Sequence, residues 1–306
     1  EIYGFDNLSR KGAEQNPAKL SRLGVTFVHG DVRSPDDLSK LPKFDIVIHA
    51  AAEPSVLAGD EKTAKGLVAV NFVGTLNVLD LVKRDRSPII FISSSRVYSI
   101  EQIEDLNFAK FGERFELAEN DGVNGVSVEG FSEAFSTDGH KSLYGSTKIC
   151  SEEVIREYSK LFGFKYIVLR SGLVSGPGQF GKKDQGVVSY WLNAHLVGKP
   201  LSFIGFGGMG HQVRDVLHIY DLCELVEAAL TNSFDGWGEV YNVGGGLKNS
   251  VSLAELTRLC EEVTNKRIEI TSQPEVRNND IRYYVTDNTK LIQKSGWVPS
   301  RTPREV

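Results

Sequence analysis

Short apolar runs alternate with longer segments of helical spacing along the first half of the chain. The apolar runs predict strands at residues 2–5, 25–29, 44–50, 88–93 and 166–170. Apolar positions three and four residues apart predict helices at 13–23, 35–41, 64–83 and 143–162. Apolar strands that alternate with helices are typical of a parallel sheet covered by helices on both faces. The pattern therefore predicts an α/β fold with a doubly wound parallel sheet.

The pattern changes after residue 170, where Gly, Pro and aromatic residues become more frequent. We expect a first domain over residues 1–172 and a smaller, intertwined α/β lobe over 173–306. A helix and a strand within about 215–246 are expected to return to the first sheet. The elements predicted in this half are helices at 186–197, 219–230, 253–264 and from 288, and strands at 201–204, 239–243, 267–271 and 282–285.

Residues 99–140 differ from the rest of the chain. They have no clear period and carry ten acidic residues against two basic ones, Lys110 and Arg114. A structureless connection of this length in a compact domain is usually functional or disordered. We predict a lid or an insert that shapes a substrate site, and a solvated acidic loop without a role is nearly as good an interpretation.

Composition and charge narrow the class of partner. The 306 residues are 41% hydrophobic and 25% charged, which is ordinary for a globular protein. The net charge of −5 excludes the basic surface typical of nucleic-acid binding. No stretch approaches the ~20 apolar residues of a membrane helix. We therefore expect neither a nucleic acid nor a membrane as partner, and an anionic ligand would be held by a few local arginines.

Cysteine and histidine usage does not suggest a metal or a disulfide framework. Cys150, Cys223 and Cys260 are far apart and form no C-x-x-C pair, and the six histidines lack metal-ligand spacing. Cys150 and Cys260 lie among apolar residues in helical patterns. We expect buried, reduced thiols, no metal, and a cytoplasmic location.

The motif Tyr144-Gly-Ser-Thr-Lys148 opens a predicted helix. The i, i+4 spacing places both side chains on one helix face, where an ammonium group would favour the phenolate. Such a tyrosine can act as a general base on an alcohol. Taken alone the pattern is weak, because a surface tyrosine over a lysine stem would look the same.

A serine triplet, Ser93-Ser94-Ser95, follows a buried apolar strand. Ligands of parallel sheets bind at the carboxyl ends of the strands, so a hydroxyl here could hold a substrate oxygen near Tyr144. The alternative is that these serines only cap the end of the strand. The presence of both motifs in one chain makes this alternative the weaker interpretation.

Polar or small residues also follow the earlier strands. Asp6 comes after the first strand, where a carboxylate accepts hydrogen bonds from the ribose of NAD, although nearby Arg10 could instead meet a 2′-phosphate. Asp31 follows the second strand, and His49-Ala-Ala-Ala52 closes the third with small residues. Both aspartates could equally be helix caps, so their order along successive strands is what carries the argument.

In this order the motifs resemble the extended short-chain dehydrogenase/reductases, the NAD-dependent nucleotide-sugar epimerases and dehydratases. The resemblance covers nearly the whole chain and is weakest over 99–140. It implies a Rossmann-like fold, NAD as cofactor and a nucleotide sugar as substrate. Later segments agree with it, namely Leu169-Arg-Ser-Gly-Leu-Val-Ser-Gly-Pro-Gly178, Gln212-Val-Arg-Asp-Val-Leu-His218 and Tyr241-Asn-Val-Gly-Gly245.

The resemblance also implies roles for individual residues. Tyr144 would be the catalytic base, and Lys148 would hold the nicotinamide ribose and lower the pKa of Tyr144. Ser94 would be the catalytic hydroxyl, with Ser95 the competing choice. The remaining implied residues bind cofactor (Asp6, Asn7, Ser9, Arg10, Asp31, Val32, Ala50, Ala51, Ala52 and Asn71) or substrate (Gln179, Arg214, Arg277 and Asp280).

The chain departs from the family at its start. The first strand of the family and its glycine-rich turn, which binds the pyrophosphate at a helix N-terminus, would precede Glu1. We therefore expect that the first βα unit, roughly 30 residues, is missing from this sequence. The resemblance also suggests a homodimer formed through the helices at 64–83 and 143–162.

Residues after Ser94 separate two reaction classes of the family. Dehydratases carry an Asp-Glu pair at the two positions occupied here by Ser95 and Arg96. Neither residue can exchange the two protons that elimination of water requires. The sequence thus favours an epimerase, with a UDP-sugar 4-epimerase and a non-catalytic nucleotide-sensing Rossmann protein as alternatives.

Overall fold

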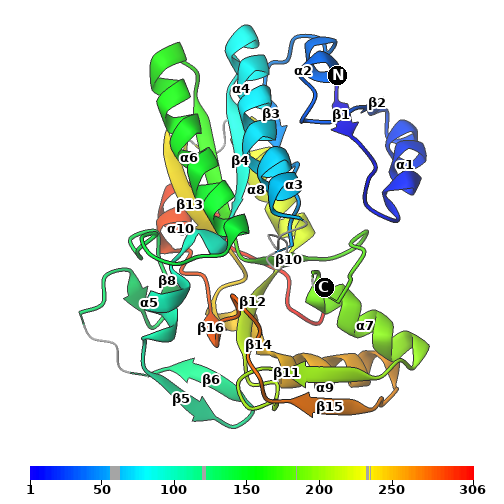
Figure 1. Ribbon diagram of the computed structural model, residues 1–306, viewed down its shortest axis with the longest axis vertical. Helices are drawn as coiled ribbons and strands as arrows, with labels where there is room; N and C mark the ends of the chain where they lie inside the picture. Colours follow the sequence, from blue (N-terminus) through cyan, green and yellow to red (C-terminus); the bar gives the residue numbers. More distant parts are fainter. Residues whose placement is uncertain (56–62, 119–121, 184, 232–233, 235) are drawn as a thin grey trace.

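The computed structural model describes residues 1–55, 63–118, 122–183, 185–231, 234 and 236–306. Its main sheet has four parallel strands in the order β13-β9-β4-β3 (Figure 1). The strand predicted at 239–243 joins this sheet beside β9, although it lies far along the chain. The four strands are β3 (Val47–His49), β4 (Ile89–Ser94), β9 (Tyr166–Ser171) and β13 (Glu239–Val243).

Helices cover both faces of the main sheet. On β4, Ile89 and Phe91 pack with α4 (Gly74–Asp85) and α6 (Leu143–Phe162). Ile90, which points to the opposite face, packs with the cluster that includes α8 (Ile219–Leu230) and α10 (Thr289–Ser295). Alternate residues of one strand thus enter two cores, which confirms the predicted doubly wound, Rossmann-like architecture.

The helical stretch Ala64–Asp85 corrects one expectation. It joins α3 (Ala64–Val68), a π-helical turn (Ala69–Val73) and α4, and it is long and apolar enough to cross a membrane. The prediction that no stretch reaches that length was therefore wrong. Four residues of α4 are nevertheless part of the core beside β4, so the same composition serves packing inside the protein.

The first two strands stand apart from the main sheet. β1 (Tyr3–Asp6) pairs with β2 (Thr26–His29) in parallel, and within the described residues neither strand pairs with β3. None of the residues of α1 (Asn16–Arg22) is buried. Figure 1 shows this unit, in dark blue, at the edge of the molecule beside the main sheet. Its other helical segments are η1 (Ala13–Gln15) and α2 (Pro35–Ser39).

The smaller lobe lies beyond the carboxyl ends of the main strands (Figure 1). It contains two further groups of strands, with α7 packed against α9. The elements are β10 (Leu173–Ser175), β12 (Val213–His218), β14 (Ser250–Ser252) and β16 (Tyr283–Tyr284) in one group, β11 (Leu201–Ile204) and β15 (Ile270–Gln273) in the other, and the helices α7 (Val187–Val197), α9 (Leu253–Thr264) and η4 (Leu247–Asn249).

The acidic segment 99–140 is largely folded, so the prediction of a structureless connection was wrong. Its Phe131 is fully buried and stacks on Tyr284 with ring centroids 5.2 Å apart. Residues 119–121 lie outside the described residues. The hydrophobic pattern did not predict these elements because each has only two to five residues. They are α5 (Ile100–Glu104), β5 (Phe108–Phe111), β6 (Arg114–Leu117), β7 (Val126–Ser127) and β8 (Gly130–Phe131).

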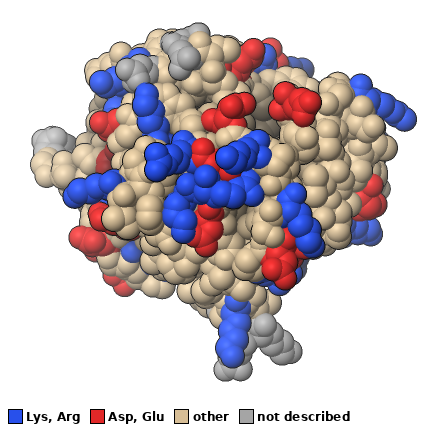
Figure 2. Space-filling model, turned by 90° about the horizontal axis from the view of Figure 1, so that it is seen from above, with Lys and Arg blue, Asp and Glu red and all other residues tan. Residues whose placement is uncertain are grey.

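Charged side chains of both signs are mixed on the surface. Figure 2, seen from above, shows lysines and arginines interleaved with acids on that face. Pairs such as Lys83–Asp80, at 2.8 Å, illustrate this mixing near the end of α4.

Of the three free cysteines only Cys260 is buried, so the expectation of a buried thiol was wrong for Cys150, which is exposed on α6.

Candidate active site

The serine triplet directs its hydroxyls to different sides of the end of β4. The Ser93 hydroxyl donates to Glu152 Oε1 at 2.5 Å, inside the protein. The Ser94 side chain instead accepts from the backbone N–H of Arg96 at 3.2 Å and lies close enough to Tyr144 to lower the pKa of its phenol. Ser95 begins the short helix η3 (Ser95–Val97). The geometry therefore favours Ser94 over Ser95 as the hydroxyl beside the tyrosine.

The start of α6 brings Tyr144 to this strand end. Ser142 caps the helix by accepting from the Gly145 N–H at 3.2 Å. Gly145 packs directly against the backbone carbonyl of Arg96, and a Cβ at this position would lie 2.0 Å from that oxygen. The absence of a side chain thus lets η3 press onto the first turn of α6, which places Ser94 next to Tyr144.

Tyr144 and Lys148 are both buried and both line a pocket, as their spacing predicts. The pKa of Tyr144 is raised by burial, and the nearby Ser94 hydroxyl and the positive charge of Arg96 partly offset that rise. The expected effect of Lys148 on this pKa stays a prediction. The Lys148 ammonium donates to the Ile92 carbonyl at 2.9 Å, and burial lowers its pKa to about 8.

A buried polar network lies behind these residues. Glu152, one turn after Lys148, forms an ion pair with Arg170 of β9 at 2.7 Å. Arg170 also donates to the Tyr98 hydroxyl at 3.3 Å, and that hydroxyl donates to Asn242 Oδ1 at 2.6 Å. Asn242 Nδ2 in turn donates to the backbone carbonyl of Phe131 at 2.9 Å. The network thus links α6 to the 99–140 segment.

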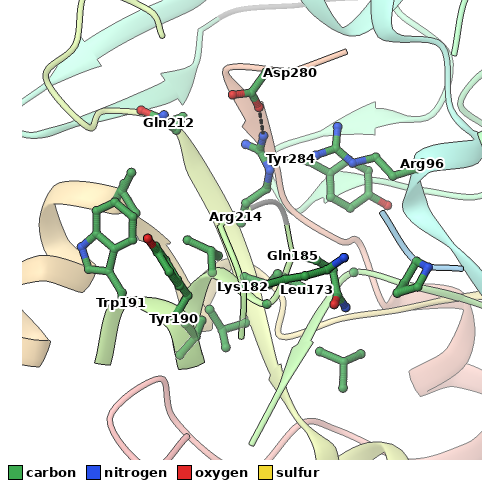
Figure 3. A pocket seen from close by; sticks show the side chains of 18 of the residues that line it. Arg96, Leu173, Lys182, Gln185, Tyr190, Trp191, Gln212, Arg214, Asp280 and Tyr284 are labelled. Carbon is green, nitrogen blue, oxygen red and sulfur yellow. Dashed lines mark hydrogen bonds and ion pairs between the residues drawn. The ribbon is translucent and has the colours of Figure 1, made fainter. Parts of the chain in front are cut away.

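The pocket has a volume of about 800 Å³ and lies between the ends of β4 and β9 and the smaller lobe. Figure 3 shows aromatic side chains of α7 at one end, Arg214 near the middle and Arg96 on the other side. Much of the residue set that the sequence suggested lines this pocket: Ala50, Ala52, Ser94, Tyr144, Lys148, Gln179, Arg214, Arg277 and Asp280.

Two of the substrate-binding candidates already have firm partners in the protein. Arg214 Nη2 donates to Asp280 Oδ1 at 3.0 Å and to the Ile281 carbonyl at 2.7 Å. Burial lowers the pKa of Arg214 to about 10, and the Asp280 carboxylate opposes that shift. The Gln179 amide donates to the Val174 carbonyl at 3.0 Å, and its oxygen accepts from Ser175 and Ser189. Gln179 therefore shapes the pocket wall through its own contacts.

The remaining cofactor candidates do not line the pocket. Asn7 Nδ2 donates to Asp31 Oδ2 at 2.8 Å, so the ends of β1 and β2 are tied together as their order suggests. Asp6 accepts from the Leu8 N–H, and Arg10 donates to the Phe180 carbonyl. Contacts within the protein thus occupy several of the polar candidates. The candidates outside the pocket lining are Asp6, Asn7, Ser9, Arg10, Asp31, Val32 and Ala51.

Asn71 is buried in the π-helical turn and holds two elements together. Its oxygen accepts from the Glu53 N–H at 2.7 Å, and its nitrogen donates to the Glu53 carbonyl and to Thr147 Oγ1. Asn71 therefore fixes the chain after β3 against α6. Asn71 does not line the pocket and its side chain is held by protein partners, so its predicted contact with the cofactor stays a prediction.

Sequence reasoning missed three charged residues of the site. Glu152 continues the four-residue spacing from Tyr144 through Lys148, which is a detectable signal. Arg96 was noted only as a residue that cannot replace a catalytic acid. Arg170, at the end of a buried strand, had no local signal. Among the described residues, no group of three His, Cys, Asp or Glu side chains is arranged to hold a metal ion.

Comparisons with known proteins agree with this geometry. The model of the NAD dependent epimerase/dehydratase family matches residues 1–244. The chain is 32% identical to CDP-paratose 2-epimerase of Salmonella typhi, over all of this chain and 89% of the relative. It is 29% identical to a putative UDP-glucose 4-epimerase of Methanocaldococcus jannaschii, over 89% of this chain and 78% of the relative. UDP-glucuronic acid 4-epimerase from Bacillus cereus, solved in complex with UDP-glucuronic acid and NAD, superposes with a TM-score of 0.77 at 23% identity, over all of this chain and 88% of that structure.

Proposed function

The chain belongs to the NAD dependent epimerase/dehydratase family, and we propose that it is an isomerase that interconverts two epimers of a nucleotide sugar through a transient keto sugar. The observation that carries the proposal is the placement of Ser94 beside Tyr144 at the end of β4, lining one pocket with Lys148, which is one turn further along α6. The similarity to CDP-paratose 2-epimerase favours a CDP-linked sugar epimerised at carbon 2.

The pocket's own residues would move and hold the proton. Tyr144 takes the proton of a sugar hydroxyl, while Ser94 hydrogen-bonds to the same oxygen and fixes its position. The positive charge of Arg96 favours the phenolate form of Tyr144 that accepts the proton. Once the keto sugar has turned over in the pocket, the hydride would return to the opposite face of the carbonyl carbon, and the same tyrosine would return the proton to the oxygen.

The residues present fit NAD. Ala50 and Ala52 give a wall of small side chains, and the buried Lys148 ammonium lines the same pocket. Asp6 and Asp31, at the ends of β1 and β2, offer carboxylate acceptors to ribose hydroxyls and to an adenine amino group. When bound, NAD supplies the hydride acceptor and donor of the reaction. Lys148 would hold the nicotinamide ribose through donors that its bond to Ile92 leaves available.

The structure around Ser94 supports an epimerase over a dehydratase. The Arg96 guanidinium lines the pocket where dehydratases carry a catalytic glutamate, and an arginine stays protonated throughout. Elimination of water needs one group to take a proton and another to give one. The product should therefore have the mass of the substrate and differ in one stereocentre.

Incubation with NAD and with CDP-, UDP- and dTDP-hexoses, followed by NMR and mass spectrometry, tests the proposal. We expect an epimer of a CDP-hexose at carbon 2, and no product with Tyr144→Phe. A carbon-4 epimer of a UDP-sugar would establish the alternative epimerase. Loss of water or carbon dioxide would overturn the epimerase reading, and turnover of no nucleotide sugar would favour a nucleotide-sensing protein.

We propose further that two copies associate through α4 and α6, which lie side by side (Figure 1). Val73, in the π-helical turn before α4, and Leu161 on α6 are apolar side chains that stay 42% and 72% exposed in one chain. Sedimentation velocity should show a dimer, and a charge at exposed Val73 should weaken it. The three free thiols suit a reducing, cytoplasmic location.

A further inference from the structure

Arg96 connects the catalytic end of β4 to the segment that carries Asp280. Its Nη1 donates to the Asn279 carbonyl at 3.1 Å, and Arg214 reaches the neighbouring Asp280 carboxylate at 3.0 Å. Both guanidinium groups line the pocket. Figure 3 shows the two side chains extending toward the same region from opposite sides, with Tyr284 beside them.

Several charged groups meet at this point. Arg96 and Arg214 repel each other, and the Asp280 carboxylate attracts both. The Glu104 and Asp215 carboxylates also act on Arg214, whereas Arg96 shares Asp280 with Arg214, and Arg277 lines the same pocket. Like charges removed from water cost free energy unless an anion joins them. A diphosphate carries such charge and suits the guanidinium fork.

The order of residues along the pocket assigns the two arginines to different phosphates. Tyr190 and Trp191 lie on the far side of Arg214 from Arg96, where a nucleoside would find aromatic surface (Figure 3). Arg96 follows Ser94 by two residues and is close enough to Tyr144 for its charge to act on the phenol. Arg96 therefore lies on the sugar side of Arg214.

We propose that Arg96 binds the phosphate next to the sugar of a nucleoside-diphosphate sugar, while Arg214 binds toward the nucleoside. This assignment rests on the proposed function. It gives Arg96 a substrate contact in addition to its structural bond to Asn279. If Arg96 only held Asn279 in place, its loss would weaken the binding of every nucleotide equally. If it contacts the second phosphate, its loss weakens only the binding of ligands that have this phosphate.

Titration calorimetry with nucleoside mono- and diphosphates separates these effects without turnover. The pairs CMP with CDP and UMP with UDP are compared, and the pair that the wild type binds is used. We expect Arg96→Gln to weaken diphosphate binding about tenfold or more, the scale of a lost charge-assisted hydrogen bond, and monophosphate binding less than about twofold. Arg96→Lys keeps the positive charge but loses the paired N–H donors of the guanidinium group. It should therefore weaken diphosphate binding by a smaller factor and should not weaken monophosphate binding.

Arg282→Gln is the matched control. Arg282 pairs with Glu104 at 3.4 Å near the same segment, but it is not among the residues that line the pocket. This variant should bind both ligands like the wild type. Equal weakening of mono- and diphosphate by Arg96→Gln and Arg96→Lys would show a purely structural role and overturn the inference, as would unchanged binding. A wild type that binds neither pair would overturn the proposed function itself.

Discussion

Two parts of the molecule present polar side chains at the ends of parallel strands, and they are held in different ways. At β4 and β9 the carboxylate of Glu152 and the guanidinium of Arg170 are 0% and 7% exposed. At β2 the comparable pair, Asp31 and Arg33, is 21% and 50% exposed. The proposed reacting groups thus lie beside a buried network, whereas the predicted cofactor edge relies on local turns in contact with water.

Strand pairing explains the difference. β4 has a strand on each side and helices on both faces, so polar groups at its end are enclosed. In the described part of the chain β2 pairs only with β1, and β1 has no second partner. A strand end without neighbours on both sides leaves its polar groups in contact with solvent, where ion pairs contribute little.

The largest effect should come from the buried pair. Glu152→Gln leaves the Arg170 charge buried without its partner, and we expect unfolding free energy to fall by about 3–5 kcal/mol. The isosteric change Asp31→Asn should cost under about 1 kcal/mol, because that pair is exposed. Urea denaturation of both variants measures this. Equal losses would show that the two edges are held alike.

Removal of the reacting groups should come next. Tyr144→Phe and Lys148→Ala should each lower turnover by at least ~10²-fold, the scale of a lost general base, while the fold survives. Turnover is measured on the nucleotide sugar that the wild type accepts, with circular dichroism as the check on folding. Wild-type turnover in a folded Tyr144→Phe variant would remove this residue from the mechanism.

The open edges of β1 and β3 allow a third test. A version of the chain extended at its N-terminus by a βα unit, with a strand to pair with both edges, should bind NAD at least about tenfold more tightly. Backbone N–H donors at the start of the added helix would meet the pyrophosphate, and each such charge-assisted bond contributes on that scale. Equal NAD affinities by calorimetry would contradict this account.

The smallest effect concerns pH. Burial lowers the pKa of Lys148 to about 8, so its ammonium form is lost in the folded protein as pH rises through that value. If the cation holds the ribose, the affinity for NAD measured by calorimetry should weaken as the pH rises through about 8. His49, which faces Lys148, has a pKa lowered to about 3 by burial and does not titrate in this range. A flat profile from pH 7 to 9 would contradict the role.

Much of the fold was set by the sequence pattern. The predicted helices at 143–162, 219–230 and 253–264 agree with α6, α8 and α9 to the residue. Their apolar faces are long and periodic, so local spacing was sufficient. The spacing of Tyr144 and Lys148 likewise placed both at one pocket, because a helix fixes the relation of residues four apart.

Tertiary structure alone decided how these groups are charged and held. The 99–140 segment folds because Phe131, Tyr98 and Tyr284 bury one another, which no short-range period reveals. The partner of Glu152 comes from β9, and the cation that acts on Tyr144 comes from the turn after β4. The local sequence pattern shows which face of a helix or strand is apolar. The pKa of a group and its ion-pair partner depend instead on its burial and on its distance from other elements. Both quantities are determined only when segments distant in the sequence pack together.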